Sequence, residues 1–128
     1  MSDKKRRSKL ELTFEDILKE GKAEYDYEVT KINYIVPESK HVYTVDWTLP
    51  KNILLETKGY LSDSQERNKY ILIKQQFPEI DLRFIFANNK KLCGGMKTTH
   101  EAWAIKNGFK YCSIKDLDVI QSWIEESK

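Results

Sequence analysis

The stretch from Val42 to Gly59 constrains the fold of this chain more than any other segment. It reads as two apolar strands joined around residues 49–52, and three charged residues lie inside them: Asp46, Glu56 and Lys58. A strand this rich in valine, tryptophan, isoleucine and leucine is expected to be at least half buried, where an unpaired charge costs several kcal/mol. The two carboxylates therefore need a compensating partner, and a divalent cation such as Mg²⁺, which takes carboxylate oxygens as ligands, would supply it.

Period-two alternation along the second strand places Glu56 and Lys58 on one face, together with Leu54. If Asp46 pairs across the hairpin on that face, its carboxylate and that of Glu56 point toward a common place. An exposed cross-strand ion pair is the ordinary explanation for a Glu-x-Lys sequence in a strand, since such pairs commonly support sheets. On these residues alone, a metal site and a supporting ion pair both stay open.

The remaining hydrophobic pattern predicts one α/β domain, with a mixed central β-sheet flanked by helices. Helical periodicity predicts helices at about residues 9–20, 63–76, 98–107 and 117–124. Apolar runs predict further strands at residues 25–31, 81–87 and 109–112. Pro37 interrupts the first of these patterns, which makes residues 35–40 a bend or connector. No repeat or long linker divides the chain, so residues 10–128 are expected to form the domain.

The start of the second predicted helix carries a capping signal. Ser62, Asp63 and Ser64 can each cap a helix, and Asp63-x-x-Glu66 resembles a capping box. In such a box the glutamate side chain reaches back to the backbone N–H of the N-cap residue. The spacing therefore predicts a local role for Glu66 at the start of this helix.

Positive charge is concentrated at the N-terminus. Residues 1–9 contain one acidic residue and five basic ones, a net charge of +4 in a chain whose total is +2. The basic residues are Lys4, Lys5, Arg6, Arg7 and Lys9. Lysine and arginine clustered in a short flexible arm are typical of contact with DNA phosphates, and a solvated tail is the alternative.

Composition also limits the cellular setting. No apolar run approaches the ~20 residues needed to span a bilayer, and no apolar segment behind the basic N-terminus resembles a signal peptide. Cys93 and Cys112 are isolated, without a CxxC motif or a histidine at ligand spacing. Neither a zinc site nor a disulfide framework is therefore indicated, and we expect a protein of the cytoplasm.

Four segments carry a resemblance to a known family. They are Tyr34–Pro37, Val42–Pro50, Leu55–Gly59 and Phe77–Phe86. Together they resemble the bacteriophage endonuclease I family, which resolves four-way (Holliday) DNA junctions. The spacing Asp-x9-Glu-x-Lys is also the pattern of the wider PD-(D/E)xK nuclease superfamily. The resemblance covers roughly residues 8–112, and one departure is Val45, which stands where the family has a proline before its first catalytic aspartate.

The resemblance implies a PD-(D/E)xK nuclease core that binds one or two Mg²⁺ or Mn²⁺ ions. Asp46 and Glu56 would hold the metal, with the carbonyl of Thr57 as a neutral ligand, and Lys58 would position the attacking water. An acidic residue on the N-terminal helix completes the family's site. The string Ser-x-Leu-Glu assigns this role to Glu11, and if the alignment slips across this segment the candidates are Glu15 and Glu20.

Other basic residues are candidates for DNA contacts beside such a site. They are His41, Arg67, Lys69, Lys90, Lys91 and Lys97. For the lysines and the arginine, a solvated surface position is the ordinary alternative to a phosphate contact. For His41, as for His100, the alternative is a surface or hydrogen-bonded structural position.

The function expected from the resemblance is a metal-dependent endonuclease that resolves four-way junctions and other branched DNA in the cytoplasm of a host cell. The family also implies an intertwined homodimer, in which the chain would cross to its partner at Pro37–Lys40. A proline there stiffens an extended path and disfavours folding back. The alternatives are a PD-(D/E)xK restriction or nicking endonuclease acting on linear duplex, and an inactive DNA-binding protein with the same fold.

Overall fold

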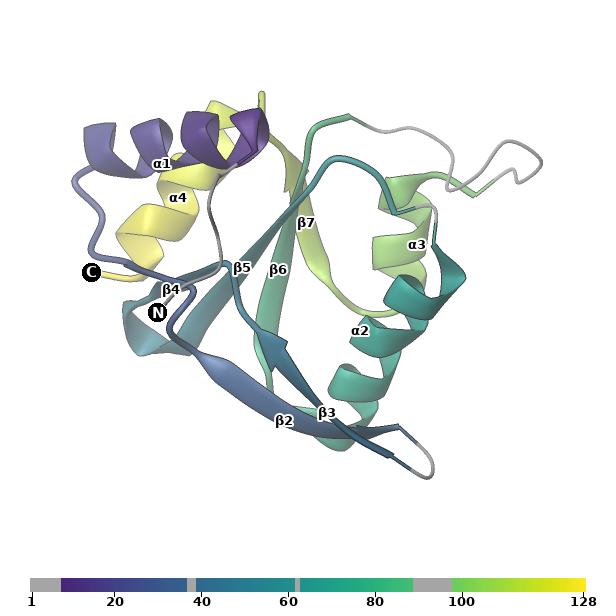
Figure 1. Ribbon diagram of the computed structural model, residues 1–128. Helices are drawn as coiled ribbons and strands as arrows, with labels where there is room; N and C mark the ends of the chain where they lie inside the picture. The colour runs from purple at the N-terminus through teal and green to yellow at the C-terminus, as the bar shows by residue number, and fades with distance from the viewer. Residues whose placement is uncertain (1–7, 37–38, 62, 89–97) are drawn as a thin grey trace.

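The computed structural model describes residues 8–36, 39–61, 63–88 and 98–128, and it forms three layers with a β-sheet between two pairs of helices (Figure 1). The elements are α1 (Lys9–Glu20), β1 (Asp26–Tyr27), β2 (Lys31–Val36), β3 (Ser39–Thr44), β4 (Trp47–Leu49), the short 3₁₀ helix η1 (Pro50–Asn52), β5 (Ile53–Lys58), α2 (Ser64–Gln76), β6 (Asp81–Phe86), α3 (His100–Lys106), β7 (Lys110–Ser113) and α4 (Leu117–Glu126). The sheet has the order β1-β4-β5-β6-β7, antiparallel from β1 to β5 and parallel from β5 to β7. The predicted α/β fold with a mixed central sheet is confirmed.

Each face of the sheet is covered by one pair of helices (Figure 1). Phe14 of α1 and Ile124 of α4 pack with Trp47 on one face. On the other face, Tyr70 of α2 packs with Phe84 of β6, in a cluster that α3 completes. Burial from both sides explains why β5 and β6 are apolar along most of their length rather than alternating. Among the described residues, no helix is long and apolar enough to cross a membrane.

The segment between α1 and β4 differs from its prediction. Residues 25–31 do not form one strand, because Glu28 adopts a positive φ of 55° that ends the short β1, and β2 begins only at Lys31. The bend predicted at residues 35–40, in contrast, is confirmed. The strands on both sides of this segment, β2 and β3, pair with each other as an antiparallel hairpin, so the chain reverses direction here. Pro37 and Glu38 lie outside the described residues.

The predicted hairpin of residues 42–59 is confirmed only in its second half. β4 and β5 pair around η1, with Trp47 opposite Leu55. The first strand is divided, because β3 pairs with β2 instead of continuing along β5. Between β3 and β4 the backbone N–H of Val45 donates to the carbonyl of Thr30 (2.9 Å). This division places Asp46 at the junction between the hairpin and the main sheet.

Helices α1 and α2 both begin with side-chain caps. Ser8 and Glu11 form a capping box at the start of α1, which was not predicted. At the start of α2 the predicted cap is Asp63, whose carboxylate accepts from the N–H of Gln65 (2.9 Å). The second half of the predicted capping box is wrong, because the Glu66 carboxylate contacts the ammonium of Lys58 across to β5.

Candidate active site

The C-terminal half of β5 carries three of the predicted site residues, Glu56, Thr57 and Lys58. Glu56 points to the face covered by α2, where Tyr70 hydrogen-bonds to it, and Lys58 points the same way. This arrangement confirms the predicted alternation. Thr57 lies between them on the strand and uses its N–H and its hydroxyl to bind Asp46. A single strand therefore presents functional groups toward both layers of the protein.

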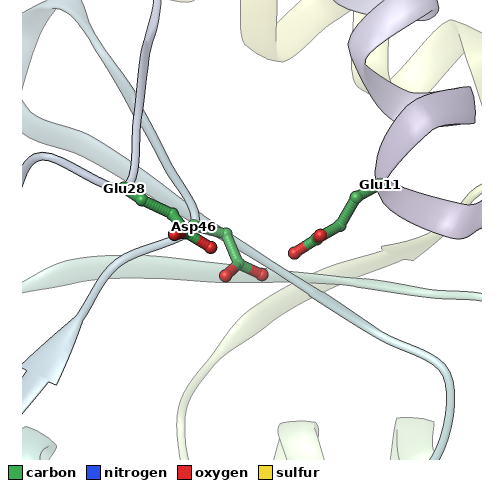
Figure 2. A group of neighbouring side chains, drawn as sticks. All are labelled: Glu11, Glu28 and Asp46. Carbon is green, nitrogen blue, oxygen red and sulfur yellow. The ribbon is translucent and has the colours of Figure 1, made fainter. Parts of the chain in front are cut away.

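A second group of acidic residues lies beside this strand. Ligand oxygens of Glu11, Glu28 and Asp46 all lie within 4.8 Å of one another. Figure 2 shows the three carboxylates pointing toward a common place from α1, from the segment between β1 and β2, and from the segment between β3 and β4. Glu11 and Asp46 are both 8% exposed, so little water reaches their charges. The structure thus brings together two predicted site residues and a third that was not predicted.

The carboxylate of Asp46 is held by Thr57. Its Oδ2 accepts hydrogen bonds from the backbone N–H (3.1 Å) and from the hydroxyl (2.9 Å) of that residue. Burial nevertheless raises the pKa of Asp46 from 3.8 to about 7, helped by the nearby charge of Glu56 and opposed by the Thr57 hydrogen bonds. Burial and the neighbouring carboxylates therefore outweigh the two hydrogen bonds from Thr57.

The predicted ligand role of the Thr57 carbonyl agrees with the direction of the strand. In an extended strand the N–H and the C=O of one residue point to the same side, as the paired bonds of antiparallel neighbours require. Because the Thr57 N–H donates to Asp46, its carbonyl faces the same edge of β5. Asp46 and this carbonyl are thus directed to one region.

Of the three helix carboxylates considered for the site, Glu11 is the one that lies beside Asp46. Its Oε1 accepts from the Tyr27 hydroxyl (3.0 Å) and lies at the end of the capping box, 3.4 Å from the Ser8 nitrogen. Glu15 instead accepts from the Tyr25 hydroxyl (2.7 Å), and Glu20 is exposed at the last turn of α1. The geometry favours Glu11 among the alternatives.

Glu28 is the residue of this group that sequence reasoning missed. The alternation of residues 25–31 predicts a continuous strand, in which Glu28 is one polar residue of the pattern. Its left-handed backbone conformation and the hydrogen bond from its N–H to the Asp46 carbonyl (3.0 Å) bring it to the site instead. Non-glycine residues rarely adopt positive φ, and no sequence signal at this position predicts it.

These groups fit a divalent cation. Three carboxylates and a carbonyl are the oxygen ligands that Mg²⁺ and Mn²⁺ prefer. Burial and the neighbouring carboxylates raise the pKa of Asp46, and a bound cation would offset both by stabilising the charged carboxylate. Glu11, Glu28 and Asp46 would hold such an ion, with the Thr57 carbonyl directed to the same edge of β5. Glu56 is not a member of this group of three carboxylates.

Glu56 is enclosed on the other side of β5. Its Oε1 accepts from the hydroxyl of Tyr43, and its Oε2 accepts from the hydroxyl of Tyr70 (3.0 Å). Burial and the charge of Glu56 raise the pKa of both tyrosines well above 10, so both remain protonated donors. Both oxygens of this carboxylate are thereby fixed in direction.

Lys58 lies between two acidic residues. Its Nζ is 3.4 Å from Oε2 of Glu56 and in direct contact with Oε2 of Glu66. Burial lowers the pKa of Lys58, but the charges of Glu56 and Glu66 outweigh it, so the net shift is upward. The side chain is 19% exposed and stays an ammonium at the edge of the site.

The predicted DNA-contact residues are only partly described. The following lie outside the described residues, and their roles stay predictions: Lys4, Lys5, Arg6, Arg7, Lys90, Lys91 and Lys97. Lys9 is the exposed first residue of α1, and His41 is exposed on β3. The guanidinium of Arg67 donates to the Leu61 carbonyl (2.7 Å), which commits part of it to holding the turn after β5.

Lys69 and His100 differ in their surroundings. The ammonium of Lys69 lies over the rings of Tyr43 (5.2 Å) and Tyr70 (4.8 Å), and burial lowers its pKa. His100 is fully buried, and its ring nitrogens bind the N–H of Leu61 (3.1 Å) and the carbonyl of Asn88 (2.9 Å). Lys69 thus packs on Tyr43 and Tyr70, the two tyrosines that hold Glu56. His100 is a hydrogen-bonded structural histidine, which is the alternative given for it above.

Comparison of the sequence with those of known proteins shows which family it resembles. The profile of the phage endonuclease I family matches residues 2–128. Endodeoxyribonuclease 1 of Enterobacteria phage T3 is 44% identical over 88 residues, which are 68% of this chain and 57% of that protein. Endonuclease I of Escherichia phage T7 is 39% identical over 105 residues, which are 81% of this chain and 68% of that protein. The matched region thus spans a little over half of the T3 protein.

Proposed function

This chain belongs to the phage endonuclease I family, and on that premise we propose that it is a divalent-metal-dependent DNA endonuclease that resolves four-way junctions and other branched DNA. The observation that carries the proposal is the meeting of Glu11, Glu28 and Asp46 within 4.8 Å beside a strand that ends in Glu56 and Lys58. This is a donor set for a hard cation with an ammonium at its edge. Metal-assisted phosphodiester hydrolysis can use both, the cation to activate water and the ammonium to stabilise the charge that develops on the phosphate.

The carboxylates and the ammonium have separate tasks in this proposal. When bound, Mg²⁺ or Mn²⁺ would lower the pKa of a water and polarise a phosphoryl oxygen. Glu11, Glu28 and Asp46 would hold and orient the ion through their oxygens, with Glu56 as the further ligand that the family resemblance implies, and Thr57 fixes the rotamer of Asp46. Lys58 is an ammonium, so it acts as a hydrogen-bond donor and not as a base. It orients the attacking water and stabilises the negative charge that develops on the phosphate.

One gel tests this function. A four-way junction, a linear duplex of the same sequence and a nicked duplex are each incubated with the protein in Mg²⁺, and in excess chelator as a control. We expect cleavage of the junction on opposing strands and an intact linear duplex. Cleavage of all substrates at one rate would indicate a nuclease without junction selectivity. Binding without cleavage in Mg²⁺ and Mn²⁺ would contradict the enzymatic proposal.

We also propose a homodimer in which each active site combines two chains. A resolvase makes two cuts within one complex, and closed two-fold symmetry supplies two equal sites from one sequence. Here Glu11 and Glu28 precede the β2–β3 hairpin, whereas Asp46, Glu56 and Lys58 follow it. If this hairpin opens and pairs between two chains, each site keeps its contacts but takes its first two carboxylates from the partner.

Mixing two defective chains tests the exchange. We expect Glu11→Ala and Lys58→Ala chains, denatured and refolded together, to regain nicking of the junction, because an exchanged heterodimer has one intact site. The matched control mixes wild-type chains with chains carrying both substitutions. In the exchanged arrangement those heterodimers have two sites with one defect each, so they add no activity. Recovery in the control but not in the first mixture would place each site within one chain.

A further inference from the structure

Glu66 does not form the capping-box contact that its sequence position predicts at the start of α2. It is at the third position of the helix, but the Asp63 cap is completed by the N–H of Gln65. Its carboxylate instead contacts the ammonium of Lys58 and lies 3.5 Å from the Tyr70 hydroxyl. The Glu66 side chain is 26% exposed and that of Lys58 is 19% exposed, so their ion pair is partly shielded from water.

The surroundings of Lys58 explain why it needs a second carboxylate. Glu56 is 3.4 Å from the ammonium, but both of its oxygens already accept from the Tyr43 and Tyr70 hydroxyls. These bonds fix the carboxylate in one direction and prevent it from following the lysine. A lysine side chain has four rotatable bonds, so one fixed partner on one side does not define the position of its nitrogen. Glu66 supplies the partner on the other side.

We propose that Glu66 is a positioning residue that holds the ammonium of Lys58 for the attack on DNA, while Tyr43 and Tyr70 hold Glu56. The inference rests on the proposed nuclease function of this site. The ammonium contacts a carboxylate fixed on β5 and a carboxylate from α2, so two elements of the fold define its position. Both carboxylates also raise the pKa of Lys58, which keeps the side chain cationic.

The proposed positioning role predicts how the effects of two substitutions on the cleavage rate combine. Two residues that act through one group show non-additive effects, whereas independent structural defects add. Removing the charge of Glu66 leaves Lys58 present but mobile, so the loss of rate should be smaller than the loss on removing the lysine. Once Lys58 has been replaced, Glu66 has nothing left to position.

The test is a double-mutant cycle on single-turnover cleavage of a four-way junction at saturating Mg²⁺. We expect Glu66→Gln to reduce the rate about tenfold in the wild-type background, less than the ~10²-fold that a misplacement of 1 Å can cost. In the Lys58→Ala background the same substitution should cost less than about twofold. Glu79→Gln, which removes an exposed carboxylate from the loop after α2, is the matched control and should leave the rate unchanged. Junction affinity and melting temperature are measured for every variant.

The outcomes separate this inference from the function on which it rests. If the wild-type protein cleaves no DNA, the proposed function fails. If the wild-type protein cleaves and Lys58→Ala is slow, but Glu66→Gln is as fast as wild type or costs the same factor in both backgrounds, the function stands and the positioning role is wrong. The positioning role is also wrong if Glu66→Gln weakens junction binding without slowing single-turnover cleavage.

Discussion

Cleavage of a four-way junction should slow by ~10²–10³ when Lys58 is replaced with alanine, because one positioned electrostatic group commonly contributes this much to a rate. Junction affinity should change little, since a single phosphate contact is a small share of the binding surface. The measurement is single-turnover cleavage at saturating Mg²⁺, together with a binding titration in Ca²⁺ or chelator. A rate within a fewfold of wild type would remove Lys58 from the mechanism.

Two further variants make this result specific. Lys106→Ala removes an exposed lysine from the end of α3 and should leave the rate unchanged, which controls for the loss of one positive charge. Lys58→Arg keeps the charge but replaces a compact ammonium with a broad planar group. Because Glu56 and Glu66 enclose the site of the ammonium, we expect the arginine variant to recover only a small part of the lost rate.

Replacing Asp46 with asparagine should abolish cleavage, because the variant loses one of the three carboxylates that meet in the proposed metal site. Calorimetric titration should show weaker binding of Mn²⁺, and Glu56→Gln should also abolish cleavage and weaken metal binding. Glu24→Gln, an exposed carboxylate before β1, is the control and should bind metal as the wild type does. Unchanged metal affinity in both site variants would mean that the metal binds elsewhere.

Asp46→Asn should also stabilise the metal-free protein at high pH. The pKa of Asp46 is raised from 3.8 to about 7, so the folded state prefers the protonated form. The stabilisation of the folded state by protonated Asp46 is complete below about pH 4 and is lost as the pH rises through 7. For a pKa shift of this size, the free energy of unfolding changes by at most about 4 kcal/mol over this range. In chelator, the variant should therefore melt several degrees above wild type at pH 8 and at the same temperature near pH 4. A variant that melts lower at pH 8 would contradict the cause given for the shift.

The sequence predicted those features of the candidate site that depend on a single strand or a single helix. Period-two alternation placed Glu56 and Lys58 on one face, and helical periodicity placed Glu11 in the first turn of α1. These positions depend on local geometry, which repeats every two residues in a strand and every 3.6 in a helix. The resemblance to the family then joined Glu11 and Asp46, which lie 35 positions apart in the sequence.

The tertiary structure decided which other side chains reach these residues. Glu28 comes to the metal group through a positive φ that no pattern predicts, and Glu66 turns from its own helix to Lys58 because α2 packs over β5. Tyr43 reaches Glu56 because β3 leaves the main sheet to pair with β2. Such contacts depend on which elements pack together and on single backbone angles. The sequence by itself determined strand β5, the helices and the residues that they present. Long-range packing decided which charges meet, because a local period contains no information about a partner that lies elsewhere in the chain.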